Sequence, residues 1–553
     1  MITSSNDSSS NQQHGSGGGG GSLSPFVCAC FTLNYLIGTG FLTLPWAFER
    51  AGILLSMIAM CIICFVSNIG VDFIVTSCAR AEVLMSYRKS KGHSYKEEGG
   101  GVEGGVEERP KKMTETTGLL LSQQIHTIGE EASSLNTKEL TSQNSDEVTP
   151  PSMGYESDDD DKSSNVSDNK NLLVVQGTHR YELTELCKIF LGDTGLKVYG
   201  ISVALDCYGF LWAYASVFGA AMAHSFPLFG PGVDCYHMYV ILFAIIVVPM
   251  SFLELAEQAS MQIFLSGCRI ACILFMIITP VIAALFESEG NMEDSIQPIA
   301  HFDDQTEPIG SPLFRLSKIH EMLPIVVYSV IFHQAVPGLV DEMKDKAKAG
   351  KIFTYTFGLC GILYSLLGII VSWYFGNQVH PSSNINWTNY HAGTGHLNEN
   401  GEWVGVSLIP RAISLFVVVF PALDVISSYP INAYTLGNSL LSFIHADNID
   451  KVQQDRRMAI FYRGIAAIPP IFGALFIRDL GIITDFSGLT GLAIAFCFPP
   501  LLYIRSESML RDLGIPYKTC YERLGSSKTT AQVIFAFGVV TIIFCSVLLI
   551  VDH

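Results

Sequence analysis

The residues best suited to hold a small ligand lie in the stretch 34–48, NYLIGTGFLTLPWAF. Gly38, Thr39 and Gly40 interrupt this otherwise apolar run, and Pro45 follows them. Inside a bilayer, a break in a helix is tolerated only where its freed backbone groups face protein or a watery cavity. The amides of such a break suit a carboxylate, and its carbonyls suit a cation. A glycine-lined helix contact or a proline kink would explain the same residues without a ligand.

A second interruption is predicted in VVYSVIFHQAVPGLVDEMKDK, which begins at residue 326. It crosses the middle of a span from Phe332 to Gly338, where Pro337 and Gly338 are expected to disrupt the helical hydrogen bonds. Matching interruptions in two halves of a chain point to a binding site at an inverted-repeat interface. A coincidental proline kink is the alternative.

Composition indicates one polytopic membrane domain. The chain has 553 residues, of which only 15% are charged, and its mean hydropathy is +0.35. The net charge of −18 is dominated by acids in polar segments, and no basic surface suggests nucleic acid. The 14 cysteines lie mostly in apolar runs, where free cysteine behaves as a small hydrophobe. No nucleophile and base set and no metal-ligand spacing indicates an enzyme.

Eleven apolar runs are close to the ~20 residues that a helix needs to cross a bilayer. They lie at about 25–48, 53–79, 197–225, 237–255, 260–285, 320–341, 352–375, 407–444, 458–477, 481–504 and 530–551. Basic residues cluster in alternate connections, which predicts a cytosolic N-terminus. The opposite connections are poor in bases, and one of them carries the sequon at Asn386, a predicted glycosylation site.

The polar segments are expected to lie outside the bundle. Residues 1–22 are predicted to be a disordered cytosolic tail, and 86–180 a disordered acidic cytosolic loop. The membrane helices then occupy 23–85 (helices 1 and 2) and 181–553 (helices 3 to 11). Within the loop, 115–120 and 168–173 fit the acidic dileucine pattern read by sorting adaptors. Endolysosomal or vacuolar and plasma membranes are both open as locations.

The first span, LNYLIGTGFLTLPWAFERAG, resembles the opening of the amino acid/auxin permease family of the amino acid–polyamine–organocation superfamily. The interrupted sixth span and the eighth-span stretch FPALDVISSYPINAYTLGNSLL are similar as well. The resemblance implies a five-plus-five inverted repeat with interrupted helices 1 and 6, a peripheral eleventh helix, and cation- or proton-driven amino acid transport. The long insert and FHQAVPG depart from the best-studied members, so the chain resembles an orphan branch.

The predicted substrate site joins the two breaks. The amides near Gly38, Thr39 and Gly40 suit a carboxylate, and the carbonyls around Phe332 and His333 suit an ammonium group. Gln334 is a weaker candidate for a gate or ligand residue. His333 could titrate, or it could be a neutral histidine bonded across helices.

A coupling-ion site is predicted beside the first break. By resemblance, Asn34 falls where sodium-using members place a helix-1 ligand, and helix 8 supplies the other half, here Asp424, Ser427 and Ser428. A mid-span carboxylate costs about 2.5–3.5 kcal/mol. Asp424 could therefore bind a proton, pair with Asn34 around Na⁺, or accept hydrogen bonds for packing.

Three further charges lie within predicted spans: Asp206, Arg269 and Asp485. Structural pairing is expected for them, with a gate at the cytosolic end as an alternative role for Arg269.

The sequence favours a secondary active transporter of small neutral amino acids, a symporter that works by alternating access. H⁺ or Na⁺ would be its coupling ion, with no other cofactor. The alternative is a solute-binding membrane sensor that signals through partners of residues 86–180.

Overall fold

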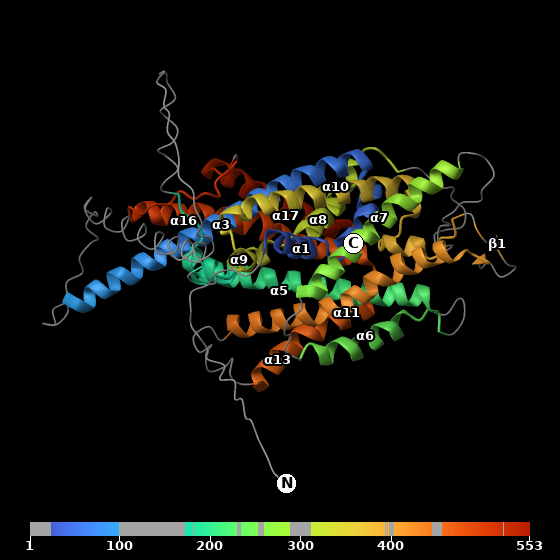
Figure 1. Ribbon diagram of the computed structural model, residues 1–553, viewed down its shortest axis with the longest axis horizontal. Helices are drawn as coiled ribbons and strands as arrows, with labels where there is room; N and C mark the ends of the chain where they lie inside the picture. The colour runs from blue at the N-terminus through green and yellow to red at the C-terminus, as the bar shows by residue number, and fades with distance from the viewer. Residues whose placement is uncertain are drawn as a thin grey trace, which may run out of the picture.

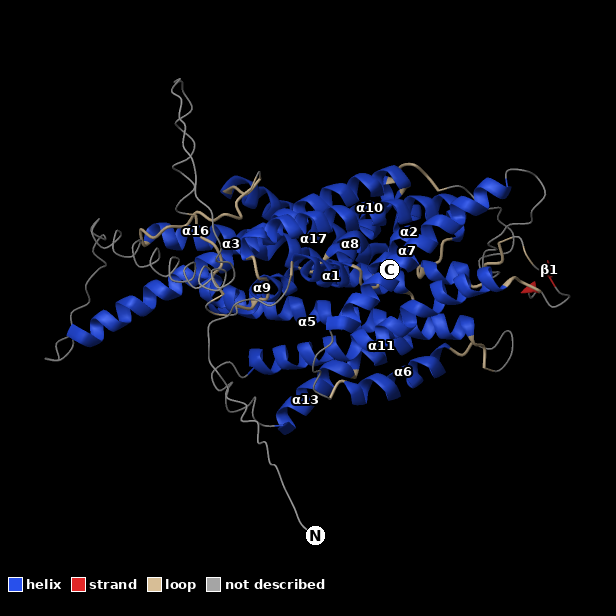
Figure 2. Cartoon of the chain, in the orientation of Figure 1, coloured by secondary structure: helices blue, strands red, loops and turns tan. Residues whose placement is uncertain are grey.

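The chain folds into a bundle of helices that run mostly along its longest axis (Figure 1). The computed structural model describes residues 24–98, 172–177, 179, 181–228, 234–252, 259–287, 311–392, 394, 396–397, 403–444, 456–523 and 525–552. Within these residues, regular β structure is confined to β1 (His396–Leu397) and β2 (Trp403–Val404), which pair antiparallel near one end of the bundle (Figure 2). The predicted tail at 1–22 lies outside the described residues.

The first span is broken, and the second is longer than predicted. Helices α1 (Pro25–Leu36) and α2 (Gly40–Ala51) meet at an angle of 54°. Helix α3 runs from Ile53 to Glu98, so residues 86–98 are helical and not part of a disordered loop. This part of the prediction was wrong because polar composition does not exclude a helix. The segment contains Arg, Lys and Glu, all good helix formers.

The middle of the chain supplies three further helices: α5 (Leu183–Ser225), α6 (Tyr236–Met250) and α7 (Ala259–Glu287). Gly192 bends α5 near its start, at a φ of +73° that favours glycine. The sixth span is again interrupted. The 3₁₀ turn η2 (Leu316–Lys318) precedes helix α8 (Ile319–Val330). Ile331, Phe332 and the turn η3 (His333–Ala335) separate α8 from α9 (Val336–Asp341).

The second half of the chain continues with η4 (Lys346–Lys348), α10 (Ala349–Phe375), η5 (Gly376–Gln378) and η6 (Ser383–Trp387). The last helices are α11 (Leu408–Ile444), α13 (Arg456–Ala467), α14 (Pro469–Phe476), α15 (Leu480–Leu492), α16 (Phe498–Asp512) and α17 (Lys528–Asp552). A π-helical turn, η7 (Ala493–Cys497), joins α15 to α16 in one long span.

By length and apolarity, nine helical spans in the described residues could cross a membrane, and the bent pair α1 and α2 makes a tenth. Helix α6 has 15 residues, fewer than the ~20 that cross a bilayer unaided. Eleven spans and the inverted repeat therefore stay predictions.

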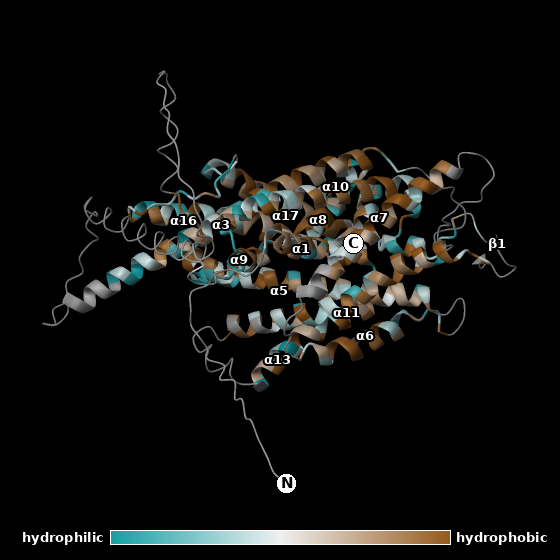
Figure 3. Cartoon of the chain, viewed as in Figure 1, coloured by the Kyte–Doolittle hydropathy of each residue, from teal (hydrophilic) through white to brown (hydrophobic). Residues whose placement is uncertain are grey.

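The helices are rich in hydrophobic residues (Figure 3). Many of their large apolar side chains are exposed, as expected for a surface against lipid. Along α17, for example, Val533, Val540, Ile543 and Ile550 are all exposed. Several charged residues are buried inside instead, among them Arg80, Asp206, Arg269 and Asp485. Since such charges are costly in a membrane interior, their partners reveal what the interior does.

Candidate functional site

The break in the first span opens a small space beside its backbone. Helix α1 ends at Leu36, whose carbonyl accepts a hydrogen bond from the Tyr364 hydroxyl at 2.8 Å. The amide of Gly38 donates to the same carbonyl at 3.0 Å. A Cβ added at Gly38 would meet nothing within 4 Å, so space is open there. Helix α2 then begins at Gly40, and the first amides of a helix have no partner within it.

The break in the sixth span lies slightly earlier than its proline predicts. Helix α8 ends at Val330, and Ile331 is extended. Pro337 and Gly338 belong to the start of α9 and do not cause the break. Proline is tolerated there because the first helical amides need no intrahelical partner.

The two breaks lie side by side. A Cβ on Gly40 would lie 2.6 Å from Ser329 Cα, so only glycine allows this close approach. Thr39 and Tyr328 directly precede Gly40 and Ser329. Their hydroxyls are 3.0 Å apart and hydrogen bonded. Phe210 of α5 stacks on the Tyr328 ring at 4.8 Å. This contact brings α2, α5 and α8 together beside the open space at Gly38.

Arg269 of α7 occupies the place where the sequence predicts a coupling cation. Its guanidinium donates Nε and Nη2 to the two carboxylate oxygens of Asp424, at 2.9 and 3.0 Å. Its Nη1 donates to the backbone and side-chain oxygens of Asn34, at 3.0 and 2.9 Å. Nη2 also reaches the Ser428 hydroxyl at 3.4 Å. Asn34, Asp424 and Ser428 therefore do come together, but around a guanidinium.

Other predicted site residues point elsewhere. The Ser427 hydroxyl bonds the Asp424 carbonyl within its own helix. The Phe332 ring packs against Phe353 and Phe357 of α10, and the His333 imidazole lies 3.2 Å from the Ser67 carbonyl of α3. The Phe332 side chain therefore contacts α10, and the His333 side chain contacts α3. Neither faces the first break. The amide oxygen of Gln334 is buried and has no hydrogen-bond partner in the part of the chain that the structure describes.

The three intramembrane charges divide into two kinds. Pairing is confirmed for Arg269, as described above. It is wrong for Asp206, which is fully buried with neither carboxylate oxygen hydrogen bonded to a described residue. In Asp485, which is 2% exposed, the oxygen Oδ1 likewise has no partner there.

The side chain of Asn386, the acceptor residue of the sequon, is buried and hydrogen bonded within the fold. Asn386 is 1% exposed, its Nδ2 donates to the Gln378 carbonyl at 2.9 Å, and its Oδ1 accepts from the His380 amide at 3.0 Å. Because a glycan attaches through Nδ2, glycosylation would break this bond and expel a buried residue. Glycosylation of Asn386 therefore stays a prediction, and the buried position of Asn386 does not favour it. Nearby, burial lowers the pKa of His380 to about 4, assisted by repulsion from His224.

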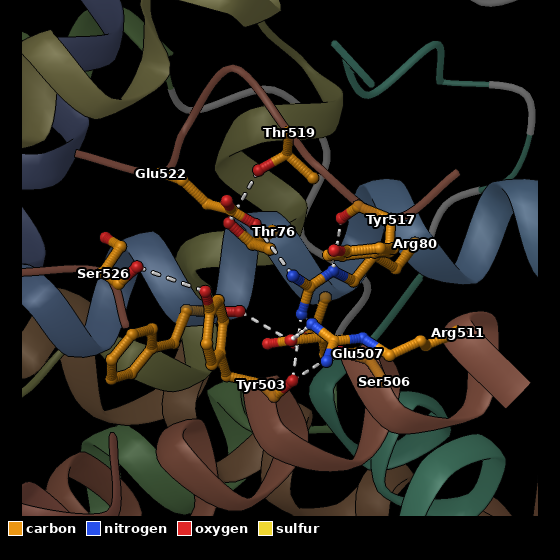
Figure 4. A network of polar contacts seen from close by, with 12 residues as sticks. Thr76, Arg80, Tyr503, Ser506, Glu507, Arg511, Tyr517, Thr519, Glu522 and Ser526 are labelled. Carbon is orange, nitrogen blue, oxygen red and sulfur yellow. Dashed lines mark hydrogen bonds and ion pairs between the residues drawn. The ribbon is translucent and has the colours of Figure 1, made fainter. Parts of the chain in front are cut away.

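Arg80 organises a second polar network at the end of the bundle where α3, α9 and α16 gather (Figures 1 and 4). Its guanidinium donates to the carbonyls of Tyr517 and Tyr503, both at 2.9 Å, and to the Ser506 hydroxyl at 3.1 Å. It also pairs with Glu522 at 2.8 Å. Burial raises the pKa of Glu522, an effect that Arg80 partly offsets. The network ties α16 and the loop after it to α3.

A short extended segment, residues 172–177, crosses the same end, and we call it the strap. Leu173 pairs with the loop after α16, donating to the Lys518 carbonyl at 2.9 Å and accepting from the Cys520 amide at 3.0 Å. Glu82 of α3 accepts from the amides of Gln176 and Gly177, at 2.7 and 2.8 Å. Leu173, the last residue of the predicted sorting pattern 168–173, is thus buried. The other pattern, 115–120, lies outside the described residues, as does most of the insert.

Sequence reasoning missed the roles of Tyr328, Tyr364 and Phe210. Tyr328 lies one turn before the predicted break, so its position was a usable signal. Nothing local marks the other two, whose partners are far away in the chain.

Comparisons with known proteins identify a family and several relatives. A family model described as transmembrane amino acid transporter protein matches residues 166–551. A relative from Dictyostelium discoideum, named transmembrane protein 104 homolog, is 24% identical over 485 residues, covering 87% of this chain and 88% of its own. The Mus musculus transmembrane protein 104 is 21% identical over 511 residues, covering 87% and 86%.

Among solved structures, the chain is similar to a manganese transporter from Eremococcus coleocola. The TM-score is 0.45 and the identity 11%, over 95% of this chain and 84% of the other.

Proposed function

Because the chain belongs to the transmembrane amino acid transporter family, we propose that it moves small neutral amino acids by secondary active transport, driven by protons and without sodium. The observation that carries the choice of ion is the place of Arg269 between Asn34 and Asp424. A guanidinium there already supplies the positive charge and the donors that these oxygens require. A sodium ion at the same position would meet strong repulsion from it.

The break at Gly38 would hold the solute carboxylate. Open space lies beside Gly38, and the first turn of α2 directs its partial positive charge toward that space. The contact of Gly40 with Ser329 and the bond between Thr39 and Tyr328 limit the room nearby. This favours small, neutral side chains over large or charged ones.

Transport would follow from alternating access. Arg269 joins α7 to the half-helix α1 and to α11, while an ion pair between Arg50 and Glu321 at 2.8 Å joins α2 to α8. The halves of the first span are therefore fastened to different partners, and they can move relative to each other at the break. We place the Arg80 end in the cytosol, following the distribution of basic residues, and an endolysosomal or plasma membrane remains the proposed location.

The test is uptake by the purified protein in proteoliposomes. A panel of radiolabelled amino acids is measured at equal pH and with an acidic exterior, in sodium and in N-methylglucamine. We expect uptake of at least one small neutral amino acid, several-fold faster with the acidic exterior and equal in the two salts. A requirement for sodium would overturn the coupling, and failure to exchange any amino acid would overturn transport itself.

The strap supports a second candidate function, a sensor that reports solute occupancy. It fastens the end of the 86–180 insert to Glu82 and to the loop after α16, so that motion of the helix ends would release it and expose Leu173. Deleting 99–171 separates the two functions, because a transporter should still move solute, whereas a sensor should lose its sorting or signalling partners. Glu82→Gln tests the strap alone, and a sensor predicts increased partner binding from it.

A further inference from the structure

We propose that Asp206 is the proton-binding group of this protein, an inference that rests on the proposed proton coupling and gives it a location. Asp206 lies on α5, fully buried, and neither of its oxygens is hydrogen bonded to a described residue. Burying an uncompensated carboxylate in a membrane interior is costly, so a group in this position is stable only when it carries a proton.

Among the described residues, no cation lies beside Asp206 that could keep it ionised. The titratable groups that face it are the phenols and the thiol of Tyr199, Cys207 and Tyr214 on α5 and of Tyr328 on α8. On neighbouring helices, Arg269 is bound to Asp424, and Arg80 to Glu522 and backbone carbonyls.

Other buried carboxylates of this protein have basic partners. The carboxylate of Asp424 accepts hydrogen bonds from Nε and Nη2 of Arg269. Asp72 receives two donors from Arg523, and Glu321 is paired with Arg50 and Lys318. Asp206 differs from all of them in having no such partner among the described residues.

A protonated Asp206 has an acceptor available. The Thr490 hydroxyl of α15 lies beside it, and it donates its own proton to the Ser487 carbonyl at 2.8 Å. The oxygen of Thr490 therefore keeps free lone pairs for a carboxyl proton. A charged carboxylate could accept the Thr490 proton only if the hydroxyl gave up its bond to the Ser487 carbonyl.

The packing around Asp206 links the proton to the break in the sixth span. A Cβ on Gly491 of α15 would lie 3.3 Å from Ile331, the first residue of that break, and 3.8 Å from Asp206 Oδ1. Gly209 lies directly against Ser487, and Gly488 against the Pro324 carbonyl, so α5, α8 and α15 are closely packed here. One turn along α5, Phe210 stacks on Tyr328, which bonds Thr39 in the first break.

These contacts define a simple proton cycle. A proton taken from water on one side bonds to one carboxylate oxygen, and the neutral carboxyl allows α5, α8 and α15 to close. When the helices open to the other side, water reaches the carboxyl, accepts the proton and hydrates the resulting carboxylate. No other atom changes its bonding, and one proton crosses for each cycle.

The test compares Asp206→Asn with Asp485→Asn in proteoliposomes. Asp485 is a matched control, since it is also a buried acid with an unbonded oxygen, but its charged neighbours are Glu321, Asp479 and Arg50 near the other end of α15. We expect Asp206→Asn to lose the stimulation of amino acid uptake by an acidic exterior and to retain exchange at equal pH. Asp485→Asn should keep both. Gradient-driven uptake that survives in Asp206→Asn would overturn the proposal.

A second readout does not depend on transport. Infrared spectroscopy of the purified protein should show the C=O stretch of protonated carboxyls at neutral pH, and Asp206→Asn should remove the part of this band that comes from Asp206. If that part is lost but no amino acid is exchanged by the wild type, the proton site stands and the transport proposal fails. A spectrum unchanged by Asp206→Asn would refute the proton site.

Discussion

Arg80 and Arg269 are the two most deeply buried arginines among the described residues, and their partners differ in kind. Arg80 is held by two backbone carbonyls, a hydroxyl and Glu522, all from α16 and the loop after it. Arg269 is held mainly by side chains of α1 and α11. Backbone carbonyls cannot turn away without unfolding, whereas side chains can change rotamer. The comparison predicts that Arg80 fixes structure and that Arg269 takes part in motion.

The largest expected effect is on folding, from Arg80→Met. This change leaves Glu522 and two buried carbonyls without their donor and should cost about 3–5 kcal/mol of unfolding free energy. Thermal unfolding of the purified protein measures it. Arg511→Met is the control, because the Arg511 side chain is 58% exposed in its pair with Glu507 in the same network, and it should cost under about 1 kcal/mol. Equal melting temperatures of the two variants would contradict the structural role given to Arg80.

At Arg269, the effects on stability and on transport should separate. Asp424→Leu leaves a buried guanidinium without its carboxylate and should lose about 3–5 kcal/mol, whereas the double variant Arg269→Met/Asp424→Leu should recover most of that loss. Uptake should stay absent in both, because the contact between α1 and α11 is gone. The claim that Arg269 serves transport would be refuted by a double variant with wild-type uptake.

Tyr328→Phe tests whether the hydrogen bond between the two breaks serves transport or stability. It removes the bond to Thr39, worth about 0.5–1.5 kcal/mol, and keeps the stacking on Phe210. If the bond shapes the solute site, KM should rise about 2- to 10-fold with little change in melting. Tyr429→Phe removes an equally buried bond, to the Ala467 carbonyl at 2.6 Å, which joins α11 to α13 and involves neither break. Its KM should be unchanged, and equal effects of the two variants would assign Tyr328 to stability alone.

The smallest effect concerns His380, at the end of the bundle opposite Arg80. Its pKa falls to about 4 through burial, while an unfolded histidine titrates near 6.5. The unfolded state therefore binds more protons between these values, and stability should decline as the pH falls from about 6.5 toward 4. Melting as a function of pH measures this slope. His380→Gln should flatten it, and an identical slope in that variant would exclude His380 as the source.

The general architecture was predictable because it follows from local patterns. Apolar runs of bilayer length gave the helices, and glycines at 38 and 40 marked the first break. The second break was found through its proline, although Pro337 proved to lie in α9 and the interruption at Ile331 and Phe332. Backbone conformation at a break depends on what packs around it, which a single segment does not reveal.

The candidate site was only partly predictable because its contacts are distant in sequence. Asn34 and Asp424 were rightly placed together, but Arg269 comes from a third helix, 155 residues from Asp424. Likewise, the sequon at Asn386 is a local pattern, while its burial depends on the fold around it. The pairing expected for Asp206 failed for the same reason, since burial without a partner is invisible in sequence.

The central claim is that the Arg269 guanidinium takes the place of a cation between α1 and α11. It is tested most directly by titrating sodium, against N-methylglucamine at equal ionic strength, while following the melting temperature of the wild type and of Arg269→Ala. Removing the guanidinium leaves oxygens of Asn34, Asp424 and Ser428 facing one another, a set suited to a hard cation. We expect sodium to stabilise Arg269→Ala and to leave the wild type unchanged. Sodium-dependent stabilisation of the wild type would contradict the claim.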